Sequence, residues 1–76
     1  MTEQQAVSLI LVELDRARNK FPFWPDDKIH AAAIVCEESG ELIQAAVQER
    51  YEHGTLDHCM TEAIHTAATA IRFMVD

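Results

Sequence analysis

The sequence predicts an all-α protein: residues 1–76 form one domain of three helices, a helical bundle completed by homo-oligomerisation. Turn-forming residues are scarce, with two Gly and two Pro among 76 residues, whereas an all-β fold needs many turns. Apolar residues recur at helical spacing in three segments. A chain this short buries only about 60% of the surface of its unfolded form, so we expect a partner subunit to complete the core.

The three predicted helices are separated by two short connections. The first spans residues 3–19, begins with a capping-box pattern at Thr2 and Gln5, and places these apolar residues at helical spacing: Val7, Ile10, Leu11, Leu14 and Ala17. The second begins near Asp27, a favourable N-cap, and ends near residue 52, where Gly54 is expected in the C′ position. The third begins after Thr55 or Asp57 and continues to the C-terminus.

The second predicted helix carries a wide apolar arc. At ~100° per residue its apolar residues cover roughly 180° of the helical wheel, whereas a surface helix typically shows a stripe a little over about 100° wide. Two companion helices of one chain hardly cover such an arc, which therefore indicates a homo-oligomer, either a dimer or a tetramer. The arc consists of Ile29, Ala32, Ala33, Val35, Cys36, Leu42, Ile43, Ala46 and Val47.

The charge and the cysteines exclude several classes of protein. The net charge is −7, and nucleic-acid-binding proteins use basic patches, so we expect no nucleic acid partner. Cys36 and Cys59 form no CxxC motif and are interpreted as buried thiols in a reducing compartment. The longest apolar run, residues 6–12, is too short to span a bilayer. We expect a cytoplasmic protein with no membrane contact.

Residues 21–25, Phe-Pro-Phe-Trp-Pro, form an aromatic connection between the first two helices. The two prolines prevent a helix through it. The rings either close the end of a helix pair or form a stacking wall for a planar ligand such as a nucleobase, and both roles are compatible with the sequence.

Carboxylates gather on two of the predicted helices. Glu37, Glu38 and Glu41 lie within ~100° of one another on the second helix, and Glu62 and His65 are one turn apart on the third. If these helices form an antiparallel hairpin, the carboxylates of the second helix face Glu62 of the third. Their negative charges repel each other, so we expect a cation between them. Mg²⁺ is the default for such oxygen ligands. The alternative is a plain solvated acidic face.

The sequence EESGEL at residues 37–42, followed by Glu62-x-x-His65 and preceded by the aromatic connection, resembles the all-α nucleoside triphosphate pyrophosphohydrolases of the MazG-like type. Their signature is EExxE on one helix and ExxD on the next, and the resemblance covers roughly residues 15–75. It implies a helical bundle completed by a second subunit. It also implies divalent-metal-dependent hydrolysis of a nucleoside triphosphate to the monophosphate and pyrophosphate, an activity suited to house-cleaning of the nucleotide pool.

The resemblance also implies roles for single residues. The metal ligands are Glu38, Glu41, Glu62 and His65, and the catalytic residues are Glu37 and Glu38, with Glu37 as a further ligand or as the base that orients water. His65 occupies the position of the family's Asp. Because an imidazole suits Mn²⁺ better than Mg²⁺, the expected cofactor is Mg²⁺ or Mn²⁺. The substrate-binding residues are Trp24 and Phe23 for the base, and Lys28 and Arg72 for the phosphates.

Two other functions remain open from the sequence. Glu-x-x-His on one helix with carboxylates on its neighbour is also the ligand pattern of di-iron carboxylate bundles, so a transition-metal protein is one alternative. A catalytically degenerate MazG-like chain that serves as an oligomeric binding module is the other.

Overall fold

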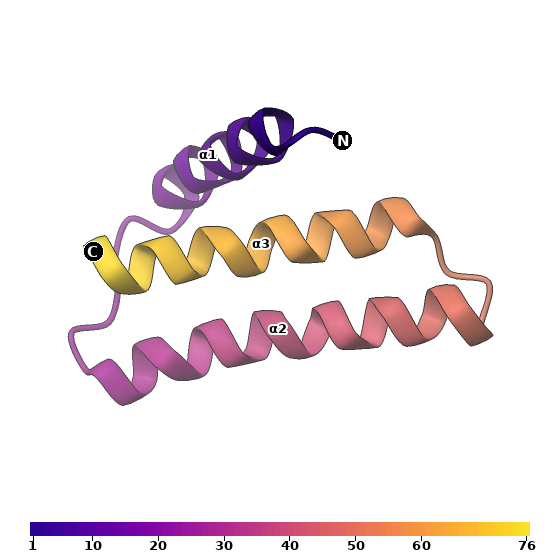
Figure 1. Ribbon diagram of the computed structural model, residues 1–76. Helices are drawn as coiled ribbons and strands as arrows, with labels where there is room; N and C mark the ends of the chain where they lie inside the picture. The colour runs from indigo at the N-terminus through magenta and orange to yellow at the C-terminus, as the bar shows by residue number, and fades with distance from the viewer.

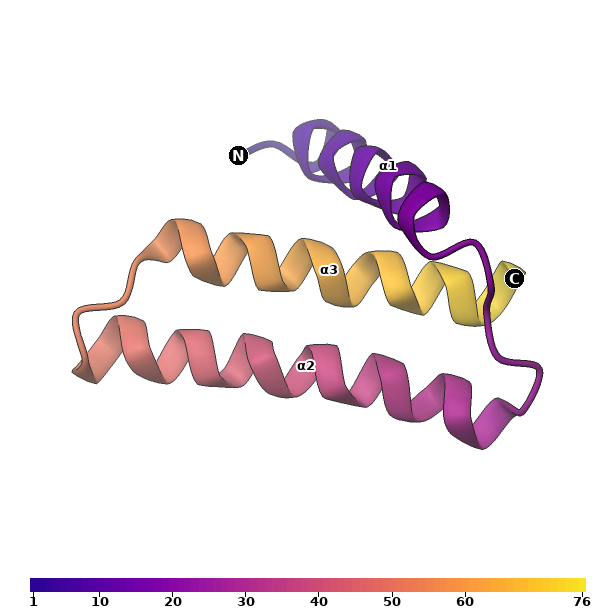
Figure 2. The same ribbon diagram turned by 180° about the vertical axis from the view of Figure 1, so that it is seen from behind.

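A computed structural model describes residues 1–76 as three α-helices without strands, which confirms the all-α prediction. Helix α1 spans Glu3–Lys20, α2 spans Lys28–Tyr51 and α3 spans Leu56–Val75. Helices α2 and α3 lie side by side as an antiparallel hairpin, and α1 lies obliquely over α3 (Figure 1, Figure 2). Because α1 packs against α3 and not against α2, α3 is the central helix of the chain.

Side-chain caps fix the start of each helix. The Thr2 hydroxyl accepts a hydrogen bond from the Gln5 backbone N–H, and the Gln5 side chain accepts one from the Thr2 backbone N–H. Asp27 and Thr55 likewise accept backbone N–H bonds at the starts of α2 and α3. Each such cap contributes about 1 kcal/mol. These caps explain why the predicted and observed helix boundaries nearly coincide.

The turn between α2 and α3 differs from the prediction for Gly54. His53 takes the left-handed conformation, with φ 63°, and no glycine has a positive φ. Gly54 is needed for space instead, because a Cβ there would lie 2.9 Å from the backbone carbon and the Cβ of Gln48. The Gly54 N–H also donates to the Gln48 carbonyl at 2.9 Å. A side chain at position 54 would therefore push the turn away from the end of α2.

The core of the single chain is small. Only four apolar residues are buried, and three of them are alanines of α2 and α3: Leu14, Ala31, Ala45 and Ala68. No large side chain is fully buried. Small side chains at the contact let α2 and α3 approach closely, so this hairpin encloses little apolar volume.

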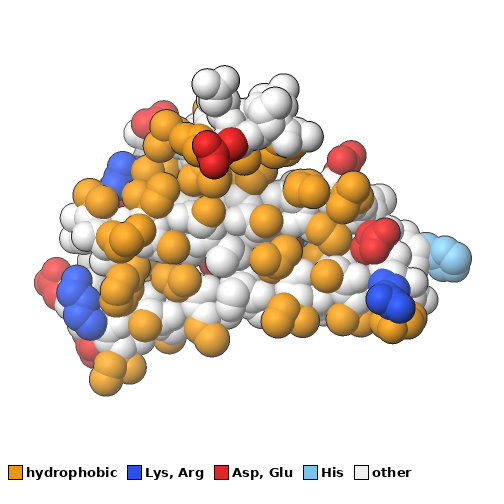
Figure 3. All heavy atoms as spheres, in the orientation of Figure 1, with side chains coloured by type: hydrophobic (Ala, Val, Ile, Leu, Met, Phe, Trp, Pro, Cys, Tyr) orange, Lys and Arg blue, Asp and Glu red, His pale blue; other side chains and the backbone are white.

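Much of the apolar arc of α2 lies on the surface. Ile29, Ile43 and Val47 are 82%, 67% and 45% exposed, and Cys36, predicted to be buried, is exposed as well. We call these four residues the outer stripe of α2. Figure 3 shows hydrophobic side chains spread over one face of the α2–α3 hairpin, with the charged side chains mainly near its ends. No helix of the chain is both long enough and apolar enough to cross a membrane.

Candidate metal centre

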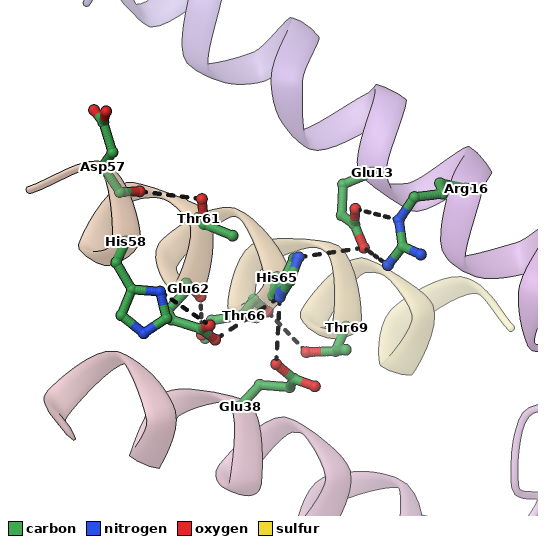
Figure 4. Close-up of polar contacts among 10 residues, drawn as sticks. All are labelled: Glu13, Arg16, Glu38, Asp57, His58, Thr61, Glu62, His65, Thr66 and Thr69. Carbon is green, nitrogen blue, oxygen red and sulfur yellow. Dashed lines mark hydrogen bonds and ion pairs between the residues drawn. The ribbon is translucent and has the colours of Figure 1, made fainter. Parts of the chain in front are cut away.

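Glu38 of α2 converges with Glu62 and His65 of α3 at the contact between the two helices (Figure 4). Ala31 and Ala45 lie seven residues before and after Glu38 and are 0% and 1% exposed. These three positions form the inner stripe of α2, which turns Glu38 toward α3. Glu62 and His65 are one turn apart and share a side of α3. One possible ligand atom from each of the three residues lies within 4.8 Å of the other two.

Each of the two carboxylates has one oxygen that is shielded from water and gains no hydrogen bond in return. Glu62 is 8% exposed, and the Oε2 atoms of Glu38 and Glu62 are buried without a hydrogen-bond partner. An unsatisfied buried polar group costs about 1–3 kcal/mol, and a charged group costs more. A divalent cation would satisfy both oxygens and would balance the two negative charges.

The imidazole of His65 stands between these carboxylates and Glu13 of α1 (Figure 4). Its Nδ1 lies 3.8 Å from Glu62 Oε2 and 4.0 Å from Glu38 Oε2, whereas its Nε2 lies 3.7 Å from Glu13 Oε2. Two ligand atoms that each lie about 2.1 Å from one ion are at most about 4.2 Å apart. The separations from Nδ1 to both oxygens are within that limit, and all three candidate ligand atoms lie within 4.8 Å of one another, so small side-chain adjustments would bring them onto one divalent cation.

The electrostatics of the site favour added positive charge. Burial raises the pKa of Glu38, and the neighbouring Glu41 carboxylate raises it further. The pKa of Glu41 is raised because its carboxyl is within hydrogen-bonding range of Glu62, which favours the protonated form. In contrast, Arg16 donates two hydrogen bonds to Glu13, at 2.7 and 2.6 Å, and these bonds lower the pKa of Glu13 against the opposing effect of burial.

The other two carboxylates predicted for the site lie outside the group of three. Glu37 is exposed, because it is turned by ~100° from Glu38 on the helical wheel. Glu41 is also exposed, although it lies beside Glu62. Of the four predicted metal ligands, the structure therefore brings together Glu38, Glu62 and His65. Glu41 is exposed and lies outside this group.

A cavity of about 440 Å³ extends from Glu38 and His65 to the aromatic connection. Its walls include three of the residues predicted to bind substrate: Phe23, Trp24 and Arg72. His65 and Arg72 are seven residues apart on α3, about 10 Å along the helix axis. The cavity therefore has a carboxylate end and, about two helical turns away, an aromatic and basic end.

Arg72 and Trp24 form one unit in the cavity wall. Arg72 is 4% exposed, its guanidinium carbon lies 4.9 Å from the Trp24 ring centroid, and its Nε donates to Asp76 at 2.8 Å. The guanidinium covers one face of the indole, so a planar ligand has access only to the other face or to Phe23, which is 91% exposed. The buried Trp24 Nε1 has no hydrogen-bond partner.

Lys28, the fourth predicted substrate-binding residue, does not line the cavity. Its Nζ lies 5.7 Å from the ring centroid of Phe73. Two residues that lie beside the site were not predicted to have a role there. The Nδ1 of His58 lies 3.9 Å from Glu62 Oε1, and Glu13 Oε2 lies 3.7 Å from His65 Nε2. The sequence contains one indication for Glu13, because it is a charged residue directly between Val12 and Leu14 in a mostly apolar stretch of α1.

Comparison with known proteins gave no relative of this chain. No family model, no curated protein and no solved structure matches it.

Proposed function

We propose that the chain is a divalent-metal-dependent nucleoside triphosphate pyrophosphohydrolase, the activity implied by its resemblance to MazG-like proteins. The observation that supports this best is the pair of buried, unpartnered oxygens of Glu38 and Glu62, of which Glu38 lines one end of the cavity together with His65. Two carboxylates match the charge of one divalent cation, and the opposite end of the cavity offers rings and a guanidinium to the rest of a nucleotide.

In this proposal Glu38, Glu62 and His65 hold Mg²⁺ or Mn²⁺. The bound cation supplies neutralisation of charge on the phosphate oxygens and lowers the pKa of a bound water. Glu37 and Glu41 stay outside the ligand group, so one of them is free to accept the proton of the attacking water. Glu41 is the nearer candidate, because it lies beside Glu62.

The aromatic end of the cavity is assigned to the nucleoside. The base stacks on the uncovered face of Trp24 or on Phe23. Arg72 keeps its Nε bond to Asp76 and presents its terminal nitrogens to the phosphates. Lys28 has no role in this arrangement, because it lies outside the cavity.

We also infer that a second copy of the chain covers the outer stripe of α2. The chain exposes 5581 Å², about 900 Å² more than the surface expected of a compact monomer of its mass, roughly 4,700 Å². Each partner in a stable complex buries about 800 Å². Ile29, Cys36 and Ile43 are spaced seven residues apart, a repeat that suits packing against another helix.

A transition-metal bundle is a second candidate function, and the position of His65 between carboxylates of all three helices favours it. Imidazole ligands are typical of iron, zinc and manganese sites rather than of magnesium sites. Rapid oxidation of Fe²⁺ in air by the purified protein, without release of pyrophosphate from any nucleotide, would favour this candidate over the hydrolase.

The decisive experiment is a screen of the common ribo- and deoxyribonucleoside triphosphates with Mg²⁺ and with Mn²⁺. We expect equal amounts of pyrophosphate and nucleoside monophosphate, without the diphosphate, when products are separated by ion-exchange chromatography. Glu38→Gln should lower the rate of hydrolysis by about 100-fold or more, because loss of a residue that only hydrogen-bonds to a metal ligand already lowers activity by about 10–100-fold.

Glu49→Gln is the matched control, because Glu49 is an exposed carboxylate of the same helix outside the cavity. It should keep the wild-type rate. Equal rates for both variants would contradict the assignment of the site. Nucleotide binding without turnover would instead favour the degenerate binding module.

A further inference from the structure

The two ring nitrogens of His65 face different groups. Nδ1 faces the α2–α3 contact, where Glu38 and Glu62 each bury an oxygen that has no hydrogen-bond partner. Nε2 faces α1, where Glu13 Oε2 is 3.7 Å away. Figure 4 shows the ring between Glu13 on one side and Glu38 on the other. The imidazole therefore connects a candidate metal centre to a third helix.

Glu13 is itself fixed in place. Arg16, one turn later on α1, donates from Nε and Nη2 to its two carboxylate oxygens at 2.7 and 2.6 Å. A bidentate pair of this kind sets the plane of the carboxylate as well as its position. Arg16 also balances the charge of Glu13, so the two negative charges of Glu38 and Glu62 remain for a divalent cation.

Glu13 does not belong to the ligand group. The residues whose possible ligand atoms converge are Glu38, Glu62 and His65, and Glu13 lies on the side of the ring opposite to the other two carboxylates. A carboxylate beyond the far nitrogen of a histidine ligand fixes the ring orientation and tautomer and makes the ligand nitrogen more basic.

We propose that Glu13, held by Arg16, is a positioning residue whose carboxylate, 3.7 Å from Nε2, moves closer to accept the Nε2–H of His65 when metal binds and so directs Nδ1 to the metal, giving a centre that prefers Zn²⁺ or Mn²⁺ to Mg²⁺. The inference rests on the metal centre of the proposed function but not on its nucleotide chemistry. A basic imidazole strengthens binding of borderline divalent ions, whereas Mg²⁺ prefers hard oxygen ligands. Helix α1 thereby takes part in metal selection without contacting the metal.

The first test measures metal affinity with the full-length chain and no nucleotide. Calorimetric titrations of the metal-free protein with Zn²⁺, Mn²⁺ and Mg²⁺ should give the tightest binding for Zn²⁺. Glu13→Gln should weaken Zn²⁺ binding by about 10–100-fold and Mg²⁺ binding by much less. Asp15→Asn is the matched control, because Asp15 is an exposed carboxylate of α1 outside the cavity, and it should leave every affinity unchanged.

The second test measures which nitrogen of the His65 ring carries the proton and which binds the metal. Long-range ¹⁵N–¹H spectra of the Zn²⁺ form should show His65 with its proton on Nε2 and the metal on Nδ1, and Glu13→Gln should shift the Nε2 and Hε2 signals. In a His65→Asp background, position 65 has no Nε2–H to orient, so Glu13→Gln should no longer change Zn²⁺ affinity. His65→Asp alone should tighten Mg²⁺ binding relative to Zn²⁺.

The outcomes separate this inference from the proposed function. Zn²⁺ binding that Glu13→Gln does not weaken, or weakens equally in the His65→Asp background, would overturn the positioning role and leave the metal centre standing. Absence of binding by all three ions would overturn both. Metal binding with the expected cycle and spectra, but without hydrolysis of any nucleotide, would support the inference and contradict the pyrophosphohydrolase.

Discussion

On the side of α2 that faces α3, every seventh residue is buried or half-buried: Ala31, Glu38 and Ala45. On the other side, the same spacing from Ile29 through Cys36 to Ile43 leaves every position exposed. The two stripes differ by two residues in register, ~200° around the helix. The helix thus turns a carboxylate toward its neighbour in the chain and isoleucines toward solvent, which reverses the usual distribution.

The two stripes indicate different partners. Burial of Glu38 opposite Glu62 is unfavourable without a counter-charge, so the inner stripe favours added positive charge, either a proton or the proposed cation. Exposure of large apolar side chains in a row is unfavourable in water, so the outer stripe requires an apolar surface. The unpartnered carboxylate oxygens and the exposed apolar row are the observations behind the proposed metal site and the inferred second copy.

The outer stripe offers the largest expected effect. Ile43→Lys would place a charge in the inferred interface, and a lysine that cannot find a partner there costs several kcal/mol. The wild type should sediment as an oligomer at micromolar concentration, and the variant should dissociate at concentrations about 100-fold higher or more. Sedimentation velocity over a dilution series measures the shift.

Gln44→Lys is the matched control for this substitution. Gln44 is an exposed neighbour of Ile43 on the same helix, but it lies ~100° away from the stripe, so the oligomer should persist. A wild-type chain that remains a stable monomer throughout the dilution series would contradict the inferred interface, and so would equal behaviour of the two variants.

The inner stripe offers the next effect. Glu62→Gln removes one unpaired buried charge and introduces an N–H that can donate to Glu38, so the free energy of unfolding of the metal-free protein should rise by about 1–2 kcal/mol. At about 4–8 °C per kcal/mol for a domain of this size, the melting temperature should rise visibly in circular dichroism at one fixed protein concentration.

The same variant should lose most of the stabilisation that divalent metal gives the wild type, because one of the three ligands has lost its charge. Glu49→Gln, which removes an exposed carboxylate, should change neither quantity by more than about 0.5 kcal/mol. A lower melting temperature for metal-free Glu62→Gln would mean that the carboxylate is already satisfied within the chain.

The smallest effect is a dependence of stability on pH. The pKa of Glu38 is raised above its usual value of 4.5. At a pH between 4.5 and this raised pKa, the folded chain therefore holds a proton that the unfolded chain has released. Stability of the metal-free protein should therefore increase as the pH falls from neutral toward 4.5. At lower pH it should decrease, because Glu13 and Asp76, whose pKa values are lowered by Arg16 and Arg18, lose their ion pairs.

Urea denaturation across this range measures the profile. Glu38→Gln should reduce the increase, and the double variant Glu38→Gln/Glu41→Gln should abolish it, because the pKa of Glu41 is raised as well. Both variants should keep the decrease, since the decrease comes from different carboxylates. An increase of stability toward pH 4.5 that survives undiminished in the double variant would show that another group causes it.

The fold was largely predictable from local signals. Thr2, Asp27 and Thr55 each combine a capping side chain with an apolar helical pattern behind it, and such signals depend only on neighbouring residues. The identity of the left-handed residue was not predictable in this way. It depends on how closely Gly54 approaches Gln48, which follows from the packing of the hairpin rather than from the preference of glycine for positive φ.

The candidate site was predictable in part. The helical wheel groups Glu37, Glu38 and Glu41, but only the axis along which α3 packs selects Glu38, and that axis is set by Ala31 and Ala45. The position of α1 was the main feature that the sequence did not predict. Nothing in the local sequence fixes the angle at which α1 lies on α3, so neither Glu13 beside His65 nor the burial of Arg72 followed from the pattern.

The crowded turn at His53 and Gly54 also limits how the length of this chain can change during evolution. A residue added to α2 or α3 between Glu38 and His65 would rotate everything beyond it by ~100° and would carry the carboxylates out of register. A residue added to the aromatic connection, which lies outside that interval, would alter only the path from α1 to the hairpin. Insertions and deletions are therefore compatible with the candidate centre in the segment that lines the aromatic end of the cavity, where they would change the shape of the cavity and leave Glu38, Glu62 and His65 in place.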